Sequence, residues 1–153
     1  MTEPVPQEME PIARLHVLKE LLPGACVVER VIDAPFAQTW DYVADLAATL
    51  PLWEPVVRRA EVALHEDDRA QVTTWGWTGR PTQFDAVIRP GWCLMQSRRS
   101  VIVMAAQPRG DATLFGHLEA LRLPGSRWFG RLTALKMRRE LDRLAELAVQ
   151  NQR

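Results

Sequence analysis

Two kinds of hydrophobic periodicity divide the chain. Apolar residues recur at three- and four-residue steps in Pro11 to Leu22, in the segment that begins at Phe36, and from Arg127 to about Val149, as they do along one face of an α-helix. Ala25 to Asp33 is instead a short β-branched run, and the region from Val56 to Leu123 contains six more strand-like runs. The pattern predicts an N-terminal helix, a strand, two short helices, six strands and a final long helix.

The six runs in the middle of the chain are separated by short turn-forming segments. They are Val56 to His65, Ala70 to Thr78, Thr82 to Arg89, Trp92 to Arg98, Val101 to Gln107 and Ala112 to Leu123. Parallel strands would need connections of a dozen or more residues, so these spacers predict antiparallel hairpins. Phe84, Ala86 and Ile88 alternate with Gln83 and Asp85, as expected of a sheet with one buried face.

The final predicted helix is long enough to cover that buried face. At roughly 1.5 Å per residue it exceeds about 30 Å in length. Its apolar stripe includes Leu132, Leu135 and Leu144, and its charged face includes Lys136 and Glu140, which we expect to be solvated. A sheet with one apolar face must be covered, so the sequence predicts an α+β domain in which a curved antiparallel sheet surrounds this helix. A curved sheet and a straight helix do not match along their whole length, which leaves room for a ligand cavity.

Three segments near the start of this domain carry a family resemblance. They are Val27 to Pro35, Trp40 to Leu46 and Leu50 to Trp53. A first strand that ends in Ala-Pro, a helix with a central Trp-Asp and a later Pro–Trp pair resemble the opening of the START-related (SRPBCC) superfamily, specifically its polyketide cyclase/dehydrase-like branch. The agreement in element order runs from residue 25 to the end and leaves residues 1–24 as an N-terminal extension.

This resemblance implies both a fold and a class of ligand. The fold is the helix-grip (START/Bet v-like) fold, here with about seven strands, two short helices after the first strand and an extra N-terminal helix. The ligands would be lipids, sterols, polyketides, quinones or other hydrophobic molecules. The superfamily shares no catalytic signature, so the resemblance assigns no catalytic residue.

Composition narrows the range of partners. Nineteen basic residues balance nineteen acidic ones, so no net field attracts nucleic acid, and we expect no nucleic-acid partner. No apolar run reaches the roughly 18 residues of a membrane span, and the acidic, proline-rich start is unlike a signal peptide. We therefore expect a cytoplasmic protein without integral membrane association. The N-terminal helix is either a lid packed on the domain or the contact of a homodimer.

Sequence motifs for metals, phosphates and nucleophilic catalysis are absent, and we expect no cofactor and no metal. Cys26 and Cys93 lie far apart among apolar neighbours, which favours two buried free thiols. Six tryptophans stand against one tyrosine, and large apolar rings are suited to cavity walls as well as to cores. The candidate ligand-binding residues are Trp53, Trp75, Trp77, Phe84, Trp92, Phe115 and Met137.

The candidates for catalysis are His117 and Glu119. They lie two residues apart on a predicted strand, so their side chains share one face of the sheet. If that face is interior, His117 can act as a general base that Glu119 orients. The alternation of Leu114, Gly116 and Leu118 favours the opposite arrangement, in which His117 and Glu119 face water.

Three functions are compatible with this sequence. The first is a protein that binds or carries a hydrophobic small molecule in an internal cavity. The second is an enzyme of the polyketide aromatase/cyclase type, whose rate comes mainly from positioning and which needs no recognisable motif. The third is a protein-interaction module of the same fold.

Overall fold

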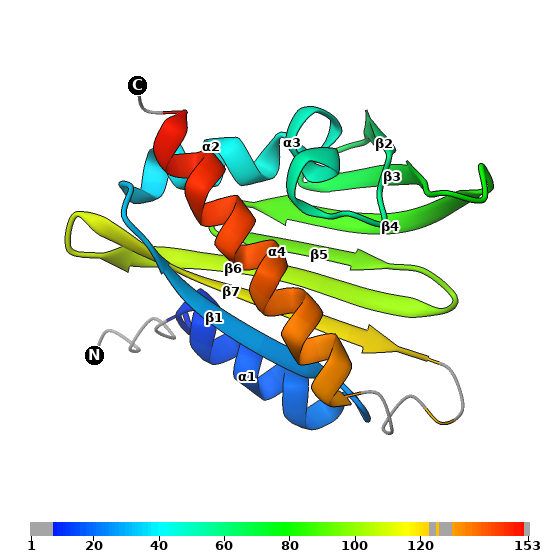
Figure 1. Cartoon of the computed structure of the whole chain (residues 1–153), viewed down its shortest axis with the longest axis horizontal. Coiled ribbons are helices and arrows are strands. Elements are labelled where there is room, and N and C mark those ends of the chain that lie inside the picture. The colour runs from blue at the N-terminus through cyan, green and yellow to red at the C-terminus, as the bar shows by residue number, and fades with distance from the viewer. Residues whose placement is uncertain (1–7, 123–124, 126–129, 152–153) are drawn as a thin grey trace, which may run out of the picture.

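The structure is a computed structural model that describes residues 8–122, 125 and 130–151. Its helices are α1 (Pro11–Leu21), α2 (Phe36–Ala44), α3 (Leu46–Trp53) and α4 (Gly130–Gln150). Its strands are β1 (Cys26–Ile32), β2 (Arg59–Leu64), β3 (Arg69–Trp75), β4 (Pro81–Arg89), β5 (Trp92–Gln96), β6 (Ser100–Arg109) and β7 (Ala112–Leu121). The predicted order of elements is confirmed (Figure 1). Within the described residues no helix is long and apolar enough to cross a membrane.

The seven strands form one antiparallel sheet in the order β1-β7-β6-β5-β4-β3-β2. Successive strands from β2 to β7 pair as hairpins, as the short connections predict, while β1 joins at the far edge beside β7. β2, β3 and β5 are shorter than predicted, and turns explain the first two. β2 begins only at Arg59, because the backbone turns at Glu54 to Val57. β3 ends at Trp75, because Gly76 to Gly79 forms a turn.

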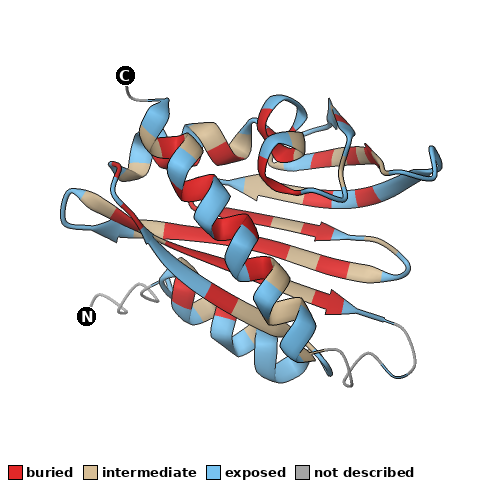
Figure 2. Ribbon diagram, viewed as in Figure 1, coloured by how far each residue is buried: buried red, intermediate tan, exposed pale blue. Residues whose placement is uncertain are grey.

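The inner face of the sheet lies beneath α4, which crosses it obliquely (Figure 1). Met137, Leu141, Leu144 and Ala148 form the buried stripe of α4, and they pack in one core with residues of α2, α3 and all seven strands. The predicted stripe is wrong at its N-terminal end, where Leu132 and Leu135 are exposed. Glu140 was expected in water but is buried within this stripe. Figure 2 shows buried residues recurring along the side of α4 that lies on the sheet.

The outer face of the sheet is covered by α1. Ile12 and Leu15 are buried there against apolar side chains of β5, β6 and β7. Gly116 of β7 makes this close approach possible, since a Cβ at this position would lie 2.6 Å from Leu15 Cδ2 and 2.9 Å from Ile12 Cδ1. The N-terminal helix thus packs on the domain, on the face opposite α4. The predicted homodimer stays a prediction.

Candidate functional site

A cavity of about 530 Å³ opens on the inner side of the sheet. Its walls come from the end of α3 and the loop after it, from the inner faces of β3 to β7, and from one residue of α4. Most of the lining is apolar, with Trp53, Phe84, Met95 and Met104 among the buried contributors. Exposed side chains from the β3–β4 and β5–β6 hairpins form its mouth. The curved sheet and the helix therefore do leave an internal space, as the pattern of elements predicts.

Three of the seven predicted ligand-binding residues line this cavity. Trp53 and Phe84 are buried in its wall, and Trp77 lies at its mouth with 74% of its surface exposed. The guanidinium carbon of Arg58 lies 4.2 Å from the centre of the Trp77 ring. These three aromatic side chains offer flat apolar surface to a ligand.

The other four predicted residues lie elsewhere. Trp75 does not share a face with Trp77, because β3 ends between them, and its ring packs under Arg59 at 3.8 Å. Trp92 points to the outer face, where it joins the cluster under α1. Phe115 and Met137 are fully buried in the inner core but are not cavity-lining residues. Successive side chains of a strand point to opposite faces. Cys93 lies on the inner face of β5, so its neighbour Trp92 lies on the outer face.

His117 and Glu119 face the interior, so the expectation that they lie in water is wrong. β7 is covered on both sides, with Gly116 and Leu118 under α1 and His117 under α4. Alternation in the sequence could not distinguish two buried faces. His117 is 1% exposed, and its Nε2 lies 3.5 Å from Glu119 Oε1. Its ring also meets Trp53 edge to face, with 5.6 Å between the ring centres.

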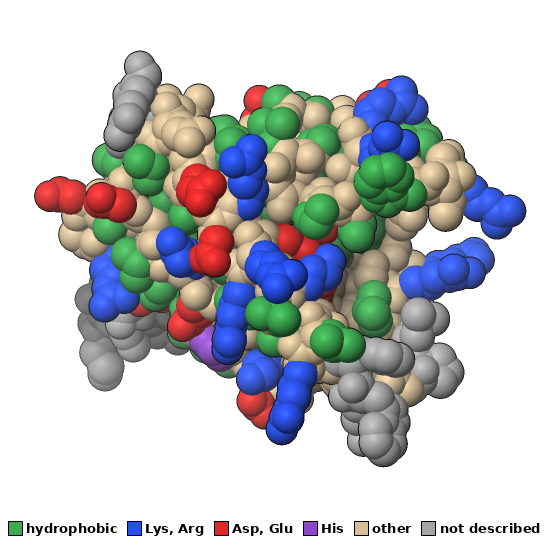
Figure 3. Space-filling view, viewed as in Figure 1, with side chains coloured by type: hydrophobic (Ala, Val, Ile, Leu, Met, Phe, Trp, Pro, Cys, Tyr) green, Lys and Arg blue, Asp and Glu red, His purple; other side chains and the backbone are tan. Residues whose placement is uncertain are grey.

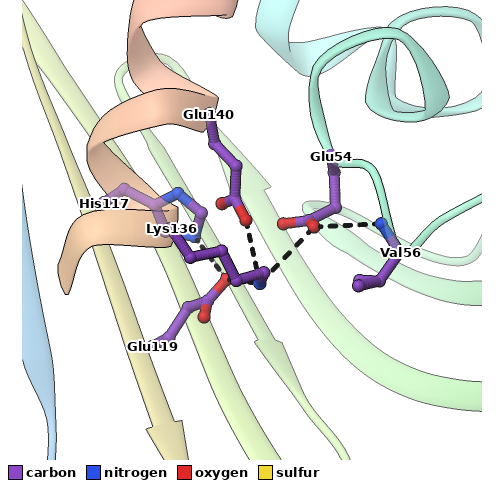
Figure 4. A network of polar contacts seen from close by, with 6 residues as sticks. All are labelled: Glu54, Val56, His117, Glu119, Lys136 and Glu140. Carbon is purple, nitrogen blue, oxygen red and sulfur yellow. Dashed lines mark hydrogen bonds and ion pairs between the residues drawn. The ribbon is translucent and has the colours of Figure 1, made fainter. Parts of the chain in front are cut away.

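Three further charged residues complete a cluster around this pair (Figure 4). Lys136 Nζ lies 2.8 Å from Glu140 Oε1, 3.5 Å from Glu119 Oε1 and 3.6 Å from Glu54 Oε1. Glu140 comes from α4, Glu119 from β7 and Glu54 from the loop after α3. The backbone N–H of Val56 donates to Glu54 Oε1 at 3.4 Å. Three carboxyl groups thus surround a single ammonium group at the cavity wall.

The cluster is electrostatically costly, because burial disfavours every charge in it. Burial raises the pKa of Glu140 to about 8, and the carboxylate of Glu54 adds to this rise. Burial also raises the pKa of Glu54, while Lys136 opposes that rise. Burial alone would lower the pKa of Lys136, but Glu119 and Glu54 raise it well above its usual range. Burial lowers the pKa of His117, so its imidazole is neutral at pH 7.

Comparison with solved structures identifies the architecture. A protein from Thermobifida fusca superposes with a TM-score of 0.66 at 16% identity, over 83% of this chain and 94% of that one. The Zhui aromatase/cyclase from Streptomyces sp. R1128 gives 0.62 at 11% identity, over 84% and 95%. Truncated norcoclaurine synthase from Thalictrum flavum gives 0.56 at 14% identity, over 80% and 91%. The chain has the helix-grip fold.

The helix-grip fold is shown by structure and not by sequence. No protein-family model matches the chain, and no curated protein sequence matches it. The superposed region covers little more than four fifths of the chain, and the resemblance stated above for residues 25 to 153 is of the same extent. The fold that this resemblance implied is confirmed. Because the sequence identities are only 11% to 16%, the comparison shows the fold and does not transfer a function.

Sequence reasoning missed Glu54, Lys136 and Glu140, although one of them carries a signal. Glu140 lies three residues after Met137 and four before Leu144, which places it within the buried stripe of α4. The position of Lys136 can be inferred from that of Glu140, because residues four apart lie on the same face of a helix, one turn from each other. Glu54 carries no such signal, because the turn after α3 alone brings it to β7 and α4.

The helix-grip domain can offer several kinds of chemistry at this wall. His117, Glu119 and Glu140 place one potential ligand atom each within 4.8 Å of one another, and a metal ion could be held there. The cluster also sets a neutral imidazole beside carboxylates and an ammonium, a combination suited to moving protons. Trp53 Nε1 is buried and has no hydrogen-bond partner among the described residues.

Proposed function

We propose that this chain binds a small, mainly apolar molecule in the cavity beneath α4. The observation that carries the proposal is the cavity itself. Its volume of about 530 Å³ lies within the range of roughly 300–1,000 Å³ that is common for ligand sites. At about 30 Å³ per water molecule in the liquid, this space is equivalent to roughly 18 waters, enough for a molecule of well over ten heavy atoms.

The walls narrow the class of ligand. Trp53, Phe84 and Met104 offer apolar surface, which favours a flat or chain-like hydrophobic body such as that of a polyketide, quinone or lipid. The indole N–H of Trp53 is buried without a partner among the described residues, and leaving such a donor unpaired is costly. A small movement of the cavity wall on binding would let a carbonyl, ether or hydroxyl oxygen of the ligand satisfy it. The ligand we propose is therefore apolar with at least one acceptor oxygen.

Native mass spectrometry of the freshly purified full-length chain tests this proposal directly. A retained mass names the ligand class. The apo chain is then titrated with N-phenyl-1-naphthylamine, a neutral apolar fluorophore, for which we expect one site. Thr74→Phe fills the cavity and should weaken binding at least tenfold, because Thr74 is buried in the cavity wall. Thr73→Phe adds the same ring to the other face of β3 and should leave binding unchanged.

Two results would count against a ligand-binding function. One is a clean apo spectrum together with no binding of the fluorophore, which would favour a protein-interaction module. The other is equal weakening by Thr74→Phe and Thr73→Phe, which would place the fluorophore outside the cavity. Circular dichroism of both variants shows whether the fold is intact.

A second candidate function is catalysis on the bound molecule, of the aromatase/cyclase type. The observation that favours it is the buried charged cluster at the cavity wall, because a pure binding protein has no need of buried charges, which destabilise the fold. His117 and Glu119 line the cavity together with Lys136, so they can reach a carbonyl-bearing ligand. His117→Gln should abolish turnover of a bound polyketide analogue while fluorophore binding is retained. Equal turnover by wild type and variant would exclude His117 from the chemistry.

A further inference from the structure

The buried cluster contains more acceptors than it can pair. His117 is 1% exposed and Glu140 is 2% exposed, yet neither ring nitrogen and neither carboxylate oxygen makes a hydrogen bond to any described residue. Lys136 Nζ forms an ion pair with Glu140 Oε1 at 2.8 Å, which still leaves Glu140 Oε2 and both ring nitrogens of His117 without a hydrogen-bond partner among the described residues. Among the described residues, the polar contact of the His117 imidazole is with Glu119 Oε1, at an ion-pair distance of 3.5 Å. Buried polar atoms without partners are rare in native proteins.

We propose that His117, Glu119 and Glu140 form a binding site for a first-row divalent cation such as Zn²⁺. Imidazole nitrogen and carboxylate oxygen are common ligands of this ion, with bonds of about 2.0–2.2 Å. In tetrahedral geometry such bonds place ligand atoms about 3.4 Å apart, and His117 Nε2 lies 3.5 Å from Glu119 Oε1. All three ligand atoms lie within 4.8 Å of one another, so closure requires movements of about 1 Å or less.

The position of Lys136 supports a cation site at this place. Its ammonium group lies within 3.6 Å of Glu54, Glu119 and Glu140 and provides the one positive charge of the cluster. Its side chain is 38% exposed, and its four-carbon stem is flexible. A divalent ion would therefore displace the ammonium toward solvent or toward Glu54. It would neutralise two carboxylates and give the His117 lone pair a partner.

The site would also be open to the cavity. Three protein ligands leave a fourth position, as in catalytic zinc sites. His117 and Glu119 both line the cavity, so a water or an oxygen atom of a bound molecule would fill that position. This link rests on the proposed ligand-binding function, whereas metal binding by the three residues can be tested without any ligand.

Isothermal titration of the untagged, chelator-treated full-length chain with Zn²⁺ tests the site. We expect one ion per chain with a Kd in the micromolar range or tighter. His117→Gln and Glu140→Gln should each weaken binding at least tenfold. Titration with Co²⁺ should produce visible absorption of the intensity typical of four-coordinate cobalt, and this absorption should be lost in both variants.

Two further variants make the test specific. His16→Gln is the matched control, because His16 Nε2 also lies 3.0 Å from a glutamate oxygen, of Glu29, but at an exposed site where no third His, Cys, Asp or Glu among the described residues joins them. It should bind Zn²⁺ as the wild type does. Lys136→Gln removes the competing ammonium and should tighten Zn²⁺ binding severalfold.

The proposal would be overturned by three results. These are absence of stoichiometric Zn²⁺ binding in the folded wild type, equal weakening by His16→Gln and His117→Gln, and weaker binding by folded Lys136→Gln. Circular dichroism reports on folding, and Glu119→Gln replaces Glu140→Gln if the latter variant does not fold. Failure of the fluorophore titration described above would leave metal binding intact, so the two proposals can fail separately.

Discussion

Cys93 illustrates how its surroundings control the chemistry of a single side chain. It is fully buried on the inner face of β5, and this burial raises the pKa of its thiol to about 12. Cys26 is half-buried, and burial and Glu119 raise its pKa less strongly. Both are free thiols, as the sequence predicts, but the predicted full burial holds only for Cys93. Since the thiolate is the reactive form, the two cysteines should differ sharply in reactivity.

Alkylation with iodoacetamide at pH 8 should label Cys26 well before Cys93. At this pH the thiolate fraction of a thiol with a pKa of about 12 is roughly a thousandfold below that of an unfolded cysteine, and burial of Cys93 also blocks the reagent. Peptide mass spectrometry over time measures both sites, and denaturation should remove the difference. Comparable labelling rates in the folded chain would show that β5 opens readily.

The charged cluster marks the limit of prediction at the scale of residues. The shared face of His117 and Glu119 follows from their spacing, but the burial of that face depends on α1, which covers the other side of β7. Glu140 could be located from its place in the stripe of α4. Glu54 could not, because its position depends on the turn after α3 and on tertiary contacts that no local pattern encodes.

At the scale of elements, the helices and strands were predictable because their periods differ. Short antiparallel connections fix the hairpin order, and the amphipathic pattern of α4 identifies the cover of the sheet. The ends of strands were less predictable, as at β2 and β3, because turns there depend on glycine and on contacts with neighbouring loops. The position of α1 was also open, since an amphipathic helix can bury its apolar face on any apolar surface.

Packing of α1 on the outer face should contribute substantially to the free energy of unfolding. Leu15 is fully buried, so Leu15→Ala should cost about 2–5 kcal/mol. Leu21 on the same helix is 70% exposed, and Leu21→Ala should change stability by about 0.5 kcal/mol or less. Urea unfolding measures both. If α1 served only as a dimer contact, Leu15→Ala would change the mass in light scattering and leave the stability of the monomer unaltered.

At the scale of the whole molecule, charge is balanced in sum but not in space. The acidic cluster lies at the inner wall of the cavity, whereas Arg80 and Arg99 line its mouth and are exposed. Figure 3 shows basic side chains projecting at the edge of the molecule where the β3–β4 and β5–β6 hairpins lie. Arg58 adds a further positive charge over Trp77 at this mouth. This polarity should orient an amphipathic ligand with its anionic end outward.

Comparing decanoate with 1-decanol tests whether the basic mouth recognises an anionic end, because the two ligands have the same alkyl chain and differ in charge. The double variant Arg80→Gln, Arg99→Gln should weaken decanoate binding about three- to tenfold at low salt, since exposed ion pairs contribute roughly 0.2–1 kcal/mol each. The difference should shrink in 1 M salt, which screens such pairs, and decanol binding should be unchanged. Displacement of N-phenyl-1-naphthylamine measures both affinities, and Arg109→Gln, an exposed residue outside the cavity lining, is the control. Equal weakening of decanoate and decanol would mean that the arginines shape the mouth and do not recognise charge.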